Sequence, residues 1–399
     1  MLKNEFCGEQ VSRLGFGTMR LPLNPDKTID EKETARMTEY ALAHGLNYFD
    51  TAFPYHGGNS EIVIGNILKN YDRNSYLLAD KYPGHQWVSV YEPAVTFETQ
   101  LEKCKTDHFD FYLLHNVCED SFATYTDERW KIVEYFAEQK KAGRIKHLGM
   151  STHSRFDHLK VLLDTFPDAT DFVQIQLNYL DWSVQQGKEK YELLQSRNIP
   201  VITMESVRGG KLAALAPKQE ETLRAFRPQL SNAGWALRFL QGLENCKVIL
   251  SGMSTFEQMR ENIALFEEEE PLKEEEKAAL YAIADEMSRS SVPCTACRYC
   301  TDGCPQGLDI PALMQTYNNI KVGGGFTASM YLESLPEGKR PQDCLKCGAC
   351  KRICPQKIDI PSVLEQVVSL APAEPNWRDI CEQREREANL IKAQAAKKD

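Results

Sequence analysis

Eight cysteines arranged as two nearly identical runs limit the structures open to this chain more than any other feature of its sequence. The chain has 399 residues and 13 cysteines, and these eight all fall between Cys294 and Cys354. The spacing Cys-x2-Cys-x2-Cys-x3-Cys-Pro starts at Cys294 and starts again at Cys344. The likeness continues beyond the cysteines, because residues 306–311 closely match residues 356–361. The chain therefore contains two copies of one short cysteine-rich unit.

This spacing is typical of proteins that bind two [4Fe–4S] clusters. Three cysteines separated by two residues each can wrap one cluster, while the fourth cysteine points away and binds the other cluster. The proline after each fourth cysteine stops the chain from continuing as a helix. The sequence therefore predicts one cluster on Cys294, Cys297, Cys300 and Cys354 and a second on Cys344, Cys347, Cys350 and Cys304.

Two other uses of clustered cysteines compete with this interpretation. Structural zinc also takes four cysteines, but zinc sites commonly use two separated pairs instead of a four-cysteine run. Disulfides suit a small secreted chain, whereas thiols grouped this tightly in a reducing compartment favour metal. The other cysteines are scattered and are interpreted as ordinary residues: Cys7, Cys104, Cys118, Cys246 and Cys381. Two iron–sulfur clusters remain the preferred prediction.

The first ~250 residues alternate short apolar runs with longer amphipathic stretches. The apolar runs cover residues 14–18, 48–50, 76–81, 109–114, 145–151, 172–177, 200–204 and 248–251. Eight strand–helix units favour a closed (β/α)8 TIM barrel, an α/β fold with a parallel sheet inside and helices outside. An open doubly wound sheet is the alternative, but the turn at 15–20 lacks the final glycine of its phosphate-binding motif.

These features divide the chain into three parts. We predict the barrel over residues 1–288, with a hairpin turn at 7–10 closing its floor and an acidic helical stretch at 261–289 leading out of it. A small, mainly helical ferredoxin-like domain follows at 289–372, because the two cysteine runs lie further apart than in compact ferredoxins. Residues 373–399 are expected to form a charged C-terminal tail without function.

Composition and charge exclude several classes of partner. Hydrophobic residues make up 42% of the chain and charged residues 26%, as in ordinary globular proteins. The formal net charge of −10 repels nucleic acid and anionic membrane surfaces. No apolar run approaches the roughly 20 residues that span a bilayer, and the first residues lack the layout of a secretory signal. We expect a cytoplasmic protein with neither nucleic acid nor membrane as a partner.

Four polar residues fall where barrel enzymes keep their chemistry, at the carboxyl ends of strands. Asp50 ends the second predicted strand, and Tyr55 follows in the next loop. Lys81 ends the third strand and His115 ends the fourth. Alone, an Asp–Lys pair is usually a structural salt bridge, and a histidine at a strand end is usually an ordinary polar residue. Four such residues on successive strand ends instead predict an active site.

The residues around this set resemble the aldo-keto reductase family. The stretch 50–55, Asp-Thr-Ala-Phe-Pro-Tyr, followed by Ser60-Glu61 and Gly65, is similar to that family's early signature. The likeness covers most of residues 11–262, and the whole chain resembles the subgroup with a C-terminal ferredoxin-like domain. The resemblance implies hydride transfer between a nicotinamide cofactor and a carbonyl or alcohol substrate, with a catalytic tetrad of Asp50, Tyr55, Lys81 and His115.

The residue types suit that chemistry. A carbonyl that receives hydride at carbon needs a proton at oxygen, and tyrosine, with a pKa of about 10, is a reluctant donor near neutral pH. An ammonium at Lys81 lowers that pKa, and Asp50 would hold Lys81 in place. The resemblance thus assigns Tyr55 as general acid and His115 as the group that orients the substrate oxygen. Candidates for an aromatic substrate mouth are Phe53, Tyr82, Trp87 and Tyr179.

The same resemblance suggests cofactor contacts. Those near the nicotinamide are Ser151, Thr152, Gln174, Asn178 and Met204, the last standing where many members stack an aromatic ring. The adenosine phosphate end would meet the loop 251–258, which offers Gly252, Ser254 and Gln258, and the adenine would meet Glu261 and Asn262. Members that prefer NADPH usually place Lys or Arg in this loop to bind the phosphate. NADH and NADPH therefore both remain open.

The pairing of the two domains leaves three functions open. A nicotinamide moves two electrons together and a [4Fe–4S] cluster moves one, so a direct path between them needs an adapter such as flavin. In the first function, the barrel is a reductase or alcohol dehydrogenase and the clusters are structural or a relay. In the second, the clusters carry electrons between a ferredoxin or flavoprotein partner and the barrel. In the third, the barrel is a non-catalytic module that senses redox state. The complete tetrad favours the first.

Overall fold

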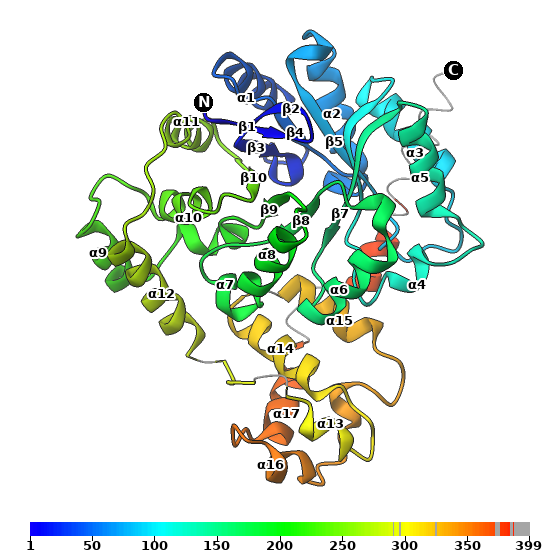
Figure 1. Ribbon diagram of the computed structural model, residues 1–399, viewed down its shortest axis with the longest axis vertical. Coiled ribbons are helices and arrows are strands. Elements are labelled where there is room, and N and C mark those ends of the chain that lie inside the picture. Colours follow the sequence, from blue (N-terminus) through cyan, green and yellow to red (C-terminus); the bar gives the residue numbers. More distant parts are fainter. Residues whose placement is uncertain (290, 295–296, 324, 372–375, 384–385, 387–399) are drawn as a thin grey trace.

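The computed structural model describes residues 1–289, 291–294, 297–323, 325–371, 376–383 and 386. A barrel with an outer layer of helices occupies the upper part of Figure 1, and a smaller helical domain lies below it. No helix among the described residues is long and apolar enough to cross a membrane.

Eight parallel strands form the closed barrel, with neighbours in the order β10-β3-β4-β5-β6-β7-β8-β9. They are β3 (Leu14–Gly17), β4 (Tyr48–Asp50), β5 (Leu77–Tyr82), β6 (Phe109–Leu114), β7 (Ile145–Thr152), β8 (Val173–Gln176), β9 (Val201–Met204) and β10 (Cys246–Ser251). Each strand corresponds to one of the predicted apolar runs. Pairing of β10 with β3 closes the sheet, which confirms the TIM barrel and excludes the open sheet.

Helices follow the strands and form the outer layer of the barrel. They are α1 (Glu31–Ala43), α2 (Asn59–Leu68), α3 (Pro93–Cys104), α4 (Phe122–Tyr125), α5 (Ile132–Lys141), α6 (Phe156–Thr165), α7 (Asp181–Val184), α8 (Gly187–Ser196), α9 (Pro217–Arg224), α10 (Asn232–Gln241), α11 (Phe256–Leu265) and α12 (Glu274–Ser288). Short 3-10 turns are η1 (Thr18–Arg20), η2 (Tyr55–Gly58), η3 (Arg73–Ser75), η4 (Pro167–Ala169) and η5 (Arg208–Ala213). The predicted acidic helix at 261–289 is two helices, because α11 ends at Leu265 and α12 starts at Glu274.

An N-terminal hairpin closes the floor of the barrel, as predicted. Strand β1 (Lys3–Phe6) pairs with β2 (Glu9–Ser12) in antiparallel fashion around the turn at Cys7 and Gly8. Phe6 is buried and stacks on Phe111 of β6 at a ring-centroid distance of 4.9 Å. The bottom of the barrel is therefore plugged by apolar side chains, and the open end is the one that carries the carboxyl ends of the strands.

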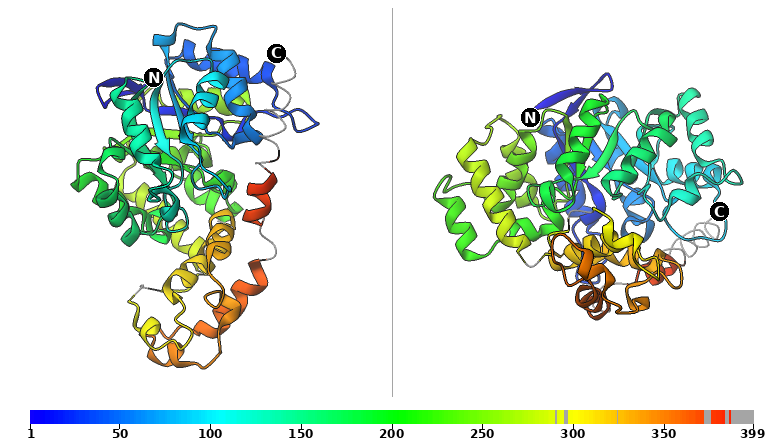
Figure 2. Two further views of the ribbon diagram at one scale, coloured as in Figure 1. Left: turned by 90° about the vertical axis from the view of Figure 1, so that its right-hand side faces the viewer. Right: turned by 60° about the horizontal axis from the view of Figure 1, so that its bottom comes forward.

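The C-terminal domain is helical and has its own apolar core. Its elements are α13 (Tyr299–Asp302), α14 (Ile310–Lys321), α15 (Gly325–Ser334), η6 (Pro341–Asp343), α16 (Ala349–Ile353) and α17 (Ile360–Leu370). In Figure 1, α14 and α15 lie next to the barrel, whereas α13, α16 and α17 lie at the far end of the molecule. The segment 376–383, red in Figure 2, runs back to the side of the barrel.

Polar contacts join this domain to the open end of the barrel. Arg155, at the start of α6, lies 3.1 Å from Asp309 at the start of α14. Gln185 donates to the side-chain oxygen of Asn319 at 2.8 Å. The hydroxyl of Ser334 donates to Asp120 at 2.6 Å. The cysteine domain is thus fixed over the face of the barrel where barrel enzymes place their active sites.

Candidate active site

Asp50, Tyr55, Lys81 and His115 come together at the open end of the barrel. The ammonium of Lys81 donates to Asp50 Oδ1 at 2.6 Å and to the carbonyl oxygen of Thr51 at 2.6 Å. The Tyr55 hydroxyl lies 3.4 Å from Lys81 Nζ. The ring of His115 packs edge-on against Tyr55 at a centroid distance of 6.0 Å. These four residues form one constellation, although two lie on strands β4 and β5 and two lie in the segments that follow β4 and β6.

The Asp50–Lys81 ion pair is almost completely withdrawn from water. Burial raises the pKa of Asp50, and the Lys81 ammonium only partly offsets that effect. Burial acts to lower the pKa of Lys81, but the neighbouring Asp50 and Tyr55 outweigh it, so this pKa lies above its ordinary value. Lys81 therefore remains an ammonium at neutral pH, and it stabilises negative charge on the adjacent Tyr55 oxygen.

A left-handed turn and a hydroxyl chain hold the loop that carries Tyr55. His56 and Gly57, within η2, have φ angles of 52° and 63°, which turn the chain sharply after Tyr55. The hydroxyl of Ser60 donates to Thr18 Oγ1 at 2.7 Å, and Thr18 Oγ1 donates to the carbonyl oxygen of Asp50 at 3.0 Å. Three consecutive barrel segments are thereby tied together around the tyrosine.

Glu61 and Gly65, the last two residues of the signature, pack α2 against α3 and do not reach the tetrad. Glu61 is fully buried and accepts hydrogen bonds from Gln100 at 3.0 Å and from Lys103 at 2.8 Å. A Cβ atom at Gly65 would lie 2.3 Å from the backbone oxygen of Lys103, so only glycine permits this approach of α2 to α3. Glu61 and Gly65 thus fix α2 against α3 behind the active site.

A cavity of about 820 Å³ opens in front of the tetrad. Asp50, Tyr55 and His115 line it, and so do most of the residues suggested as cofactor contacts: Gln174, Met204, Gly252, Ser254, Gln258, Glu261 and Asn262. The side-chain oxygen of Gln174 is buried there, and no described residue forms a hydrogen bond with it. A ligand with an N–H donor would satisfy it, which is what the carboxamide of a nicotinamide offers.

Ser151, Thr152 and Asn178 differ from their predicted role as cofactor contacts. None of the three belongs to the described lining of the cavity. Ser151 Oγ accepts from the backbone N–H of Asn116 at 2.8 Å, and Thr152 Oγ1 accepts from that of Ser154 at 2.9 Å. Asn178 donates to Asp181 at 2.6 Å. Their polar groups hold neighbouring loops, so they shape the wall of the cavity from behind.

Three cations line the cavity that sequence reasoning did not identify: Arg20, Arg208 and Lys211. Arg208 forms a buried ion pair with Asp181, while its Nε and Nη2 atoms have no hydrogen-bond partner among the described residues. Burial lowers the pKa of Arg208 to about 10. The run Arg208-Gly209-Gly210-Lys211 was the available signal, because glycines flanked by cations are typical of anion-binding turns.

The C-terminal domain supplies the roof of this cavity. Gly323, after α14, and Thr327, in α15, both line it. A Cβ atom at Gly323 would lie 2.9 Å from Nζ of Lys211, so the two domains meet closely above the loop that follows β9. The cavity is therefore formed by both domains, and a barrel alone would leave it open on this side.

The segment 376–383 packs between the barrel and α15 beside the cavity, whereas a charged tail without function was predicted for 373–399. Trp377 is buried and stacks on His85 at a centroid distance of 5.7 Å, and His85 lies 4.3 Å from the ring of His115. The backbone N–H groups of Trp377 and Arg378 donate to the carboxylate of Glu333 in α15, at 2.5 and 2.8 Å. The rest of the tail lies outside the described residues.

The residues suggested for an aromatic substrate mouth lie elsewhere. Tyr82 and Tyr179 are buried in the barrel core. Trp87 packs with Trp377, and the ring of Phe53 lies under the ammonium of Lys103 at 4.5 Å. The described lining near His115 is more polar than expected and includes Asn116, His153 and Gln176.

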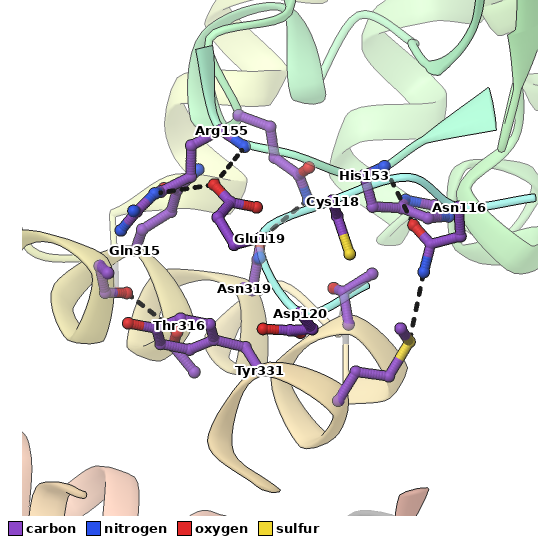
Figure 3. Close-up of a pocket in the computed structure, with 14 residues that line it drawn as sticks. Asn116, Cys118, Glu119, Asp120, His153, Arg155, Gln315, Thr316, Asn319 and Tyr331 are labelled. Atoms are coloured by element: carbon purple, nitrogen blue, oxygen red, sulfur yellow. Dashed lines mark hydrogen bonds and ion pairs between the residues drawn. The ribbon is translucent and has the colours of Figure 1, made fainter. Parts of the chain in front are cut away.

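A second, smaller cavity of about 60 Å³ lies between the two domains, and Figure 3 shows the residues that line it, with the barrel above and the C-terminal helices below. It shares Asn116, His153 and Thr327 with the main cavity. Asp120 faces it, and burial raises the pKa of this carboxyl to about 6. Burial lowers the pKa of His153 to about 4, so this imidazole is neutral. The space is wide enough for a few water molecules.

The eight clustered cysteines surround two further cavities. One is lined by Cys294, Cys297, Cys300 and Cys354, and the other by Cys304, Cys344, Cys347 and Cys350. Each cavity combines three cysteines of one run with the fourth cysteine of the other run. Isoleucine and proline side chains complete the walls, and Ile310 contributes to both. Four thiols around an apolar space suit the coordination of an iron–sulfur cluster.

Comparison with known proteins agrees with both halves of this description. The sequence model of the aldo/keto reductase family matches residues 13–285, and that of the 4Fe-4S dicluster domain matches residues 293–358. The uncharacterized oxidoreductase YqkF of Bacillus subtilis is 25% identical over 67% of this chain and 91% of its own length. The NADH-specific methylglyoxal reductase of Escherichia coli is 25% identical over 64% of this chain and 89% of its own length. The holo form of aldo-keto reductase AKR11C1 from Bacillus halodurans superimposes with a TM-score of 0.58 at 25% identity, over 71% of this chain and 96% of that structure.

Proposed function

Because this chain belongs to the aldo/keto reductase family, we propose that its barrel reduces a carbonyl compound, or oxidises the corresponding alcohol, with NADH or NADPH as hydride carrier. The observation that carries the proposal is the Tyr55 hydroxyl 3.4 Å from Lys81 Nζ, with Lys81 held by Asp50 at 2.6 Å. A phenol beside a buried ammonium is a proton donor adjusted for work near neutral pH. A purely structural ion pair would not need the tyrosine at the wall of a cavity.

Each residue of the tetrad has a separate task in this reaction. A bound nicotinamide supplies the hydride. The Tyr55 hydroxyl gives its proton to the substrate oxygen, and Lys81 stabilises the phenolate that remains. Asp50 keeps Lys81 charged and in place, and the ring of His115 orients the substrate oxygen toward Tyr55. In the direction of alcohol oxidation the Tyr55 oxygen accepts the proton instead.

The cavity offers matching partners for both ends of a nicotinamide dinucleotide. The oxygen of Gln174 would accept a hydrogen bond from the carboxamide of a bound nicotinamide, and the thioether of Met204 would offer its ring an apolar contact. Arg208 and Lys211 balance the charge of the phosphates. Gly252 and Gln258 add no cation in the loop after β10. We therefore expect NADH to be an effective cofactor, like that named for the Escherichia coli relative.

We propose further that the two cysteine cavities hold one [4Fe–4S] cluster each. The fold around them carries α14 and α15, which roof the active site, so cluster binding also stabilises the substrate cavity. A second role, electron exchange with a ferredoxin or flavoprotein, is favoured by one observation: Cys347 is exposed and lies just before α16, the helix at the far end of the molecule from the barrel.

Anaerobic purification followed by assays of metal and turnover tests these proposals. Two clusters require roughly eight irons and eight sulfides per chain; zinc in their place would reject the cluster assignment. NADH or NADPH consumption is then measured with a panel of carbonyl compounds. Tyr55→Phe is expected to lower the rate by about 10²- to 10⁴-fold while fluorescence titration shows unchanged cofactor binding. Tyr71→Phe, on the outer surface, is the matched control. Equal activity of both variants would reject the assigned role of Tyr55.

A further inference from the structure

The two cysteine runs share their cluster-binding residues but differ in the side chains they expose. Six residues of the second run have no counterpart of similar chemistry in the first: Leu345, Lys346, Lys351, Arg352, Ile353 and Lys357. The corresponding residues of the first run are Thr295, Ala296, Thr301, Asp302, Gly303 and Gly307. All six side chains of the second run are exposed, including Leu345 at 62% and Ile353 at 52%. We call these six residues the basic–apolar face.

Cluster binding does not require this face. The first run builds the same arrangement of four cysteines with small or acidic residues at the equivalent positions. Lys357 has a φ of 54°, close to the 60° of Gly307 at the matching position. A side chain in this left-handed region is strained, whereas glycine is not. A lysine therefore stands where the first run has a glycine, although the backbone conformation is the same.

The two runs also differ in their ion pairs with the barrel. Asp309, after the first run, pairs with Arg155 of the barrel at 3.1 Å. Asp359, at the matching position after the second run, pairs at 2.6 Å with Lys351 of its own domain. Helix α13 of the first run and α16 of the second both lie at the far end of the molecule (Figure 1). Asp309 after the first run reaches the barrel, whereas Asp359 after the second run has no barrel partner in the described part of the chain. The basic–apolar face is open to a partner.

The charge of this face is opposite to that of the chain as a whole. The chain carries a net charge of −10, but residues 344–357 contain four cations and no acidic residue. Lys346 and Lys351 pair with Glu365 and Asp359. Within the described part of the chain, Arg352 and Lys357 have no acidic partner within 4.0 Å. Exposed apolar side chains next to two cations without an acidic partner in the described part of the chain are suited to an acidic protein surface.

We propose that the basic–apolar face docks an acidic one-electron carrier protein beside Cys347. The proposal rests on the clusters assigned above, because Cys347 is one of the cysteines around the second cavity. In the docked complex one electron passes between the redox group of the carrier and the cluster site, so one is oxidised as the other is reduced. No bond forms and no proton moves. The net negative charge of this chain argues against a nucleic acid or a lipid surface as the occupant.

The sequence of the first run provides a variant that tests docking without threatening the fold. The swapped variant replaces the face with the residues of the first run: Leu345→Thr, Lys346→Ala, Lys351→Thr, Arg352→Asp, Ile353→Gly and Lys357→Gly. A matched control removes the same amount of positive charge from the barrel surface: Lys32→Ala, Lys188→Ala, Lys218→Ala and Arg224→Asp. Both are made in the full chain with clusters loaded, and iron and sulfide content verifies that the swapped variant keeps its clusters.

Binding of an acidic plant-type [2Fe–2S] ferredoxin, and separately of an acidic flavodoxin, is measured by calorimetry as salt is raised. Between about 0.01 M and 1 M the Debye length falls from roughly 30 to 3 Å, so charge-driven docking weakens strongly. We expect wild type and control to bind at low salt and the swapped variant to bind at least tenfold more weakly. Stopped-flow electron exchange with the clusters should slow in the same order.

Three results would overturn the proposal. Wild type could bind neither carrier at low salt. The swapped variant could bind as tightly as the control. Sedimentation could show a wild-type dimer that the swap abolishes, which would make a second copy of this chain the occupant. Failure of the proposed reductase function is distinguishable, because carbonyl-dependent NADH consumption and iron content are measured on the same samples and neither depends on the basic–apolar face.

Discussion

The active-site cavity has two sides that are built in different ways: its floor, here the open end of the barrel that carries the tetrad, and its roof, which the C-terminal domain provides. The floor is the barrel, where Asp50 and Lys81 are 2% and 0% exposed and neutralise each other. The roof is formed by the C-terminal domain around Gly323 and α15, with the segment 376–383 packed beside it, and part of its contact with the barrel is made by polar side chains that water still reaches. The side chains of Arg155 and Asp309, for example, are 30% and 29% exposed.

Because of this difference, the residues for proton transfer and the segments that cover the substrate are held by contacts of different strength. Breaking a buried ion pair leaves an uncompensated charge, so the floor tolerates little change. Partly exposed ion pairs and hydrogen bonds contribute little individually, and domain contacts of this kind resemble transient interfaces. The proton-donating tetrad is therefore held ready by the barrel, whereas the fit of the substrate depends on a roof that weaker contacts hold in place. Each prediction below changes one of these two parts.

Lys81→Met should have the largest effect, because it removes the charge that compensates Asp50 in the floor. Loss of the ammonium should lower carbonyl reduction by about 10²- to 10⁴-fold and reduce the free energy of unfolding by about 3–5 kcal/mol. Steady-state kinetics and urea denaturation measure the two quantities. The double variant Asp50→Asn/Lys81→Met should regain stability but not activity. Stability equal to that of wild type in the single variant would contradict a tightly coupled pair.

Asp120→Asn should change how the free energy of unfolding depends on pH, because Asp120 lies at the contact between the barrel and the roof. Burial raises the pKa of Asp120 in the folded protein to about 6, above the ordinary value, so the folded state binds the proton more tightly than the unfolded state. Stability from this group is therefore complete below about pH 4 and is lost as pH rises through about 6. The shift corresponds to at most about 3 kcal/mol. Urea denaturation from pH 4.5 to 8 should show that Asp120→Asn removes this loss, whereas the exposed control Asp168→Asn retains it.

Trp377→Ala should weaken substrate binding without slowing the chemical step. Trp377 supports His85, which packs on His115, so its loss should loosen the substrate oxygen without touching the Tyr55–Lys81 pair. We expect the KM for the carbonyl substrate to rise about tenfold, or about 1.4 kcal/mol, with cofactor affinity unchanged. Trp377→Phe keeps a stacked ring and should restore most of the loss. A fall in kcat alone, as large as that of Tyr55→Phe, would place Trp377 in the chemistry instead.

The sequence predicted the parts of this molecule that are encoded by regular spacing. Alternating runs identified every barrel strand, and the cysteine spacing anticipated which thiols share a cavity. The tetrad was found because barrel topology brings strand ends together. Arg20 and Trp377 were missed for the opposite reason. Arg20 lines the cavity next to Gly252, and Trp377 packs on His85, which lines it; both contacts join distant segments, and no local pattern records them.

The same limit explains why Ser151 and Thr152 were expected to contact the cofactor. Their position at the end of β7 is correct, because Thr152 is the last residue of that strand. Which way a side chain turns depends on the hydrogen bonds available to it, and both hydroxyls are used by backbone N–H groups of nearby loops. Sequence position fixes the strand end, and the surrounding loops decide which groups remain for a ligand.

The smallest effect should come from the contact between Asp309 and Arg155, and the repeat supplies its control. Asp309→Asn keeps the shape of the side chain but removes a partly exposed ion pair, which should weaken docking of the roof by about 1 kcal/mol. Asp359→Asn changes the matching residue of the second run, which contacts only its own domain, and should leave docking unchanged. Hydrogen exchange of α14 measures docking, and Arg155→Ala completes a double-mutant cycle with each variant. Coupling of Arg155 to Asp309 but not to Asp359 would show that the first run alone is bound to the barrel. Equal coupling of Arg155 to Asp309 and to Asp359 would show that the two runs do not differ in their contact with the barrel.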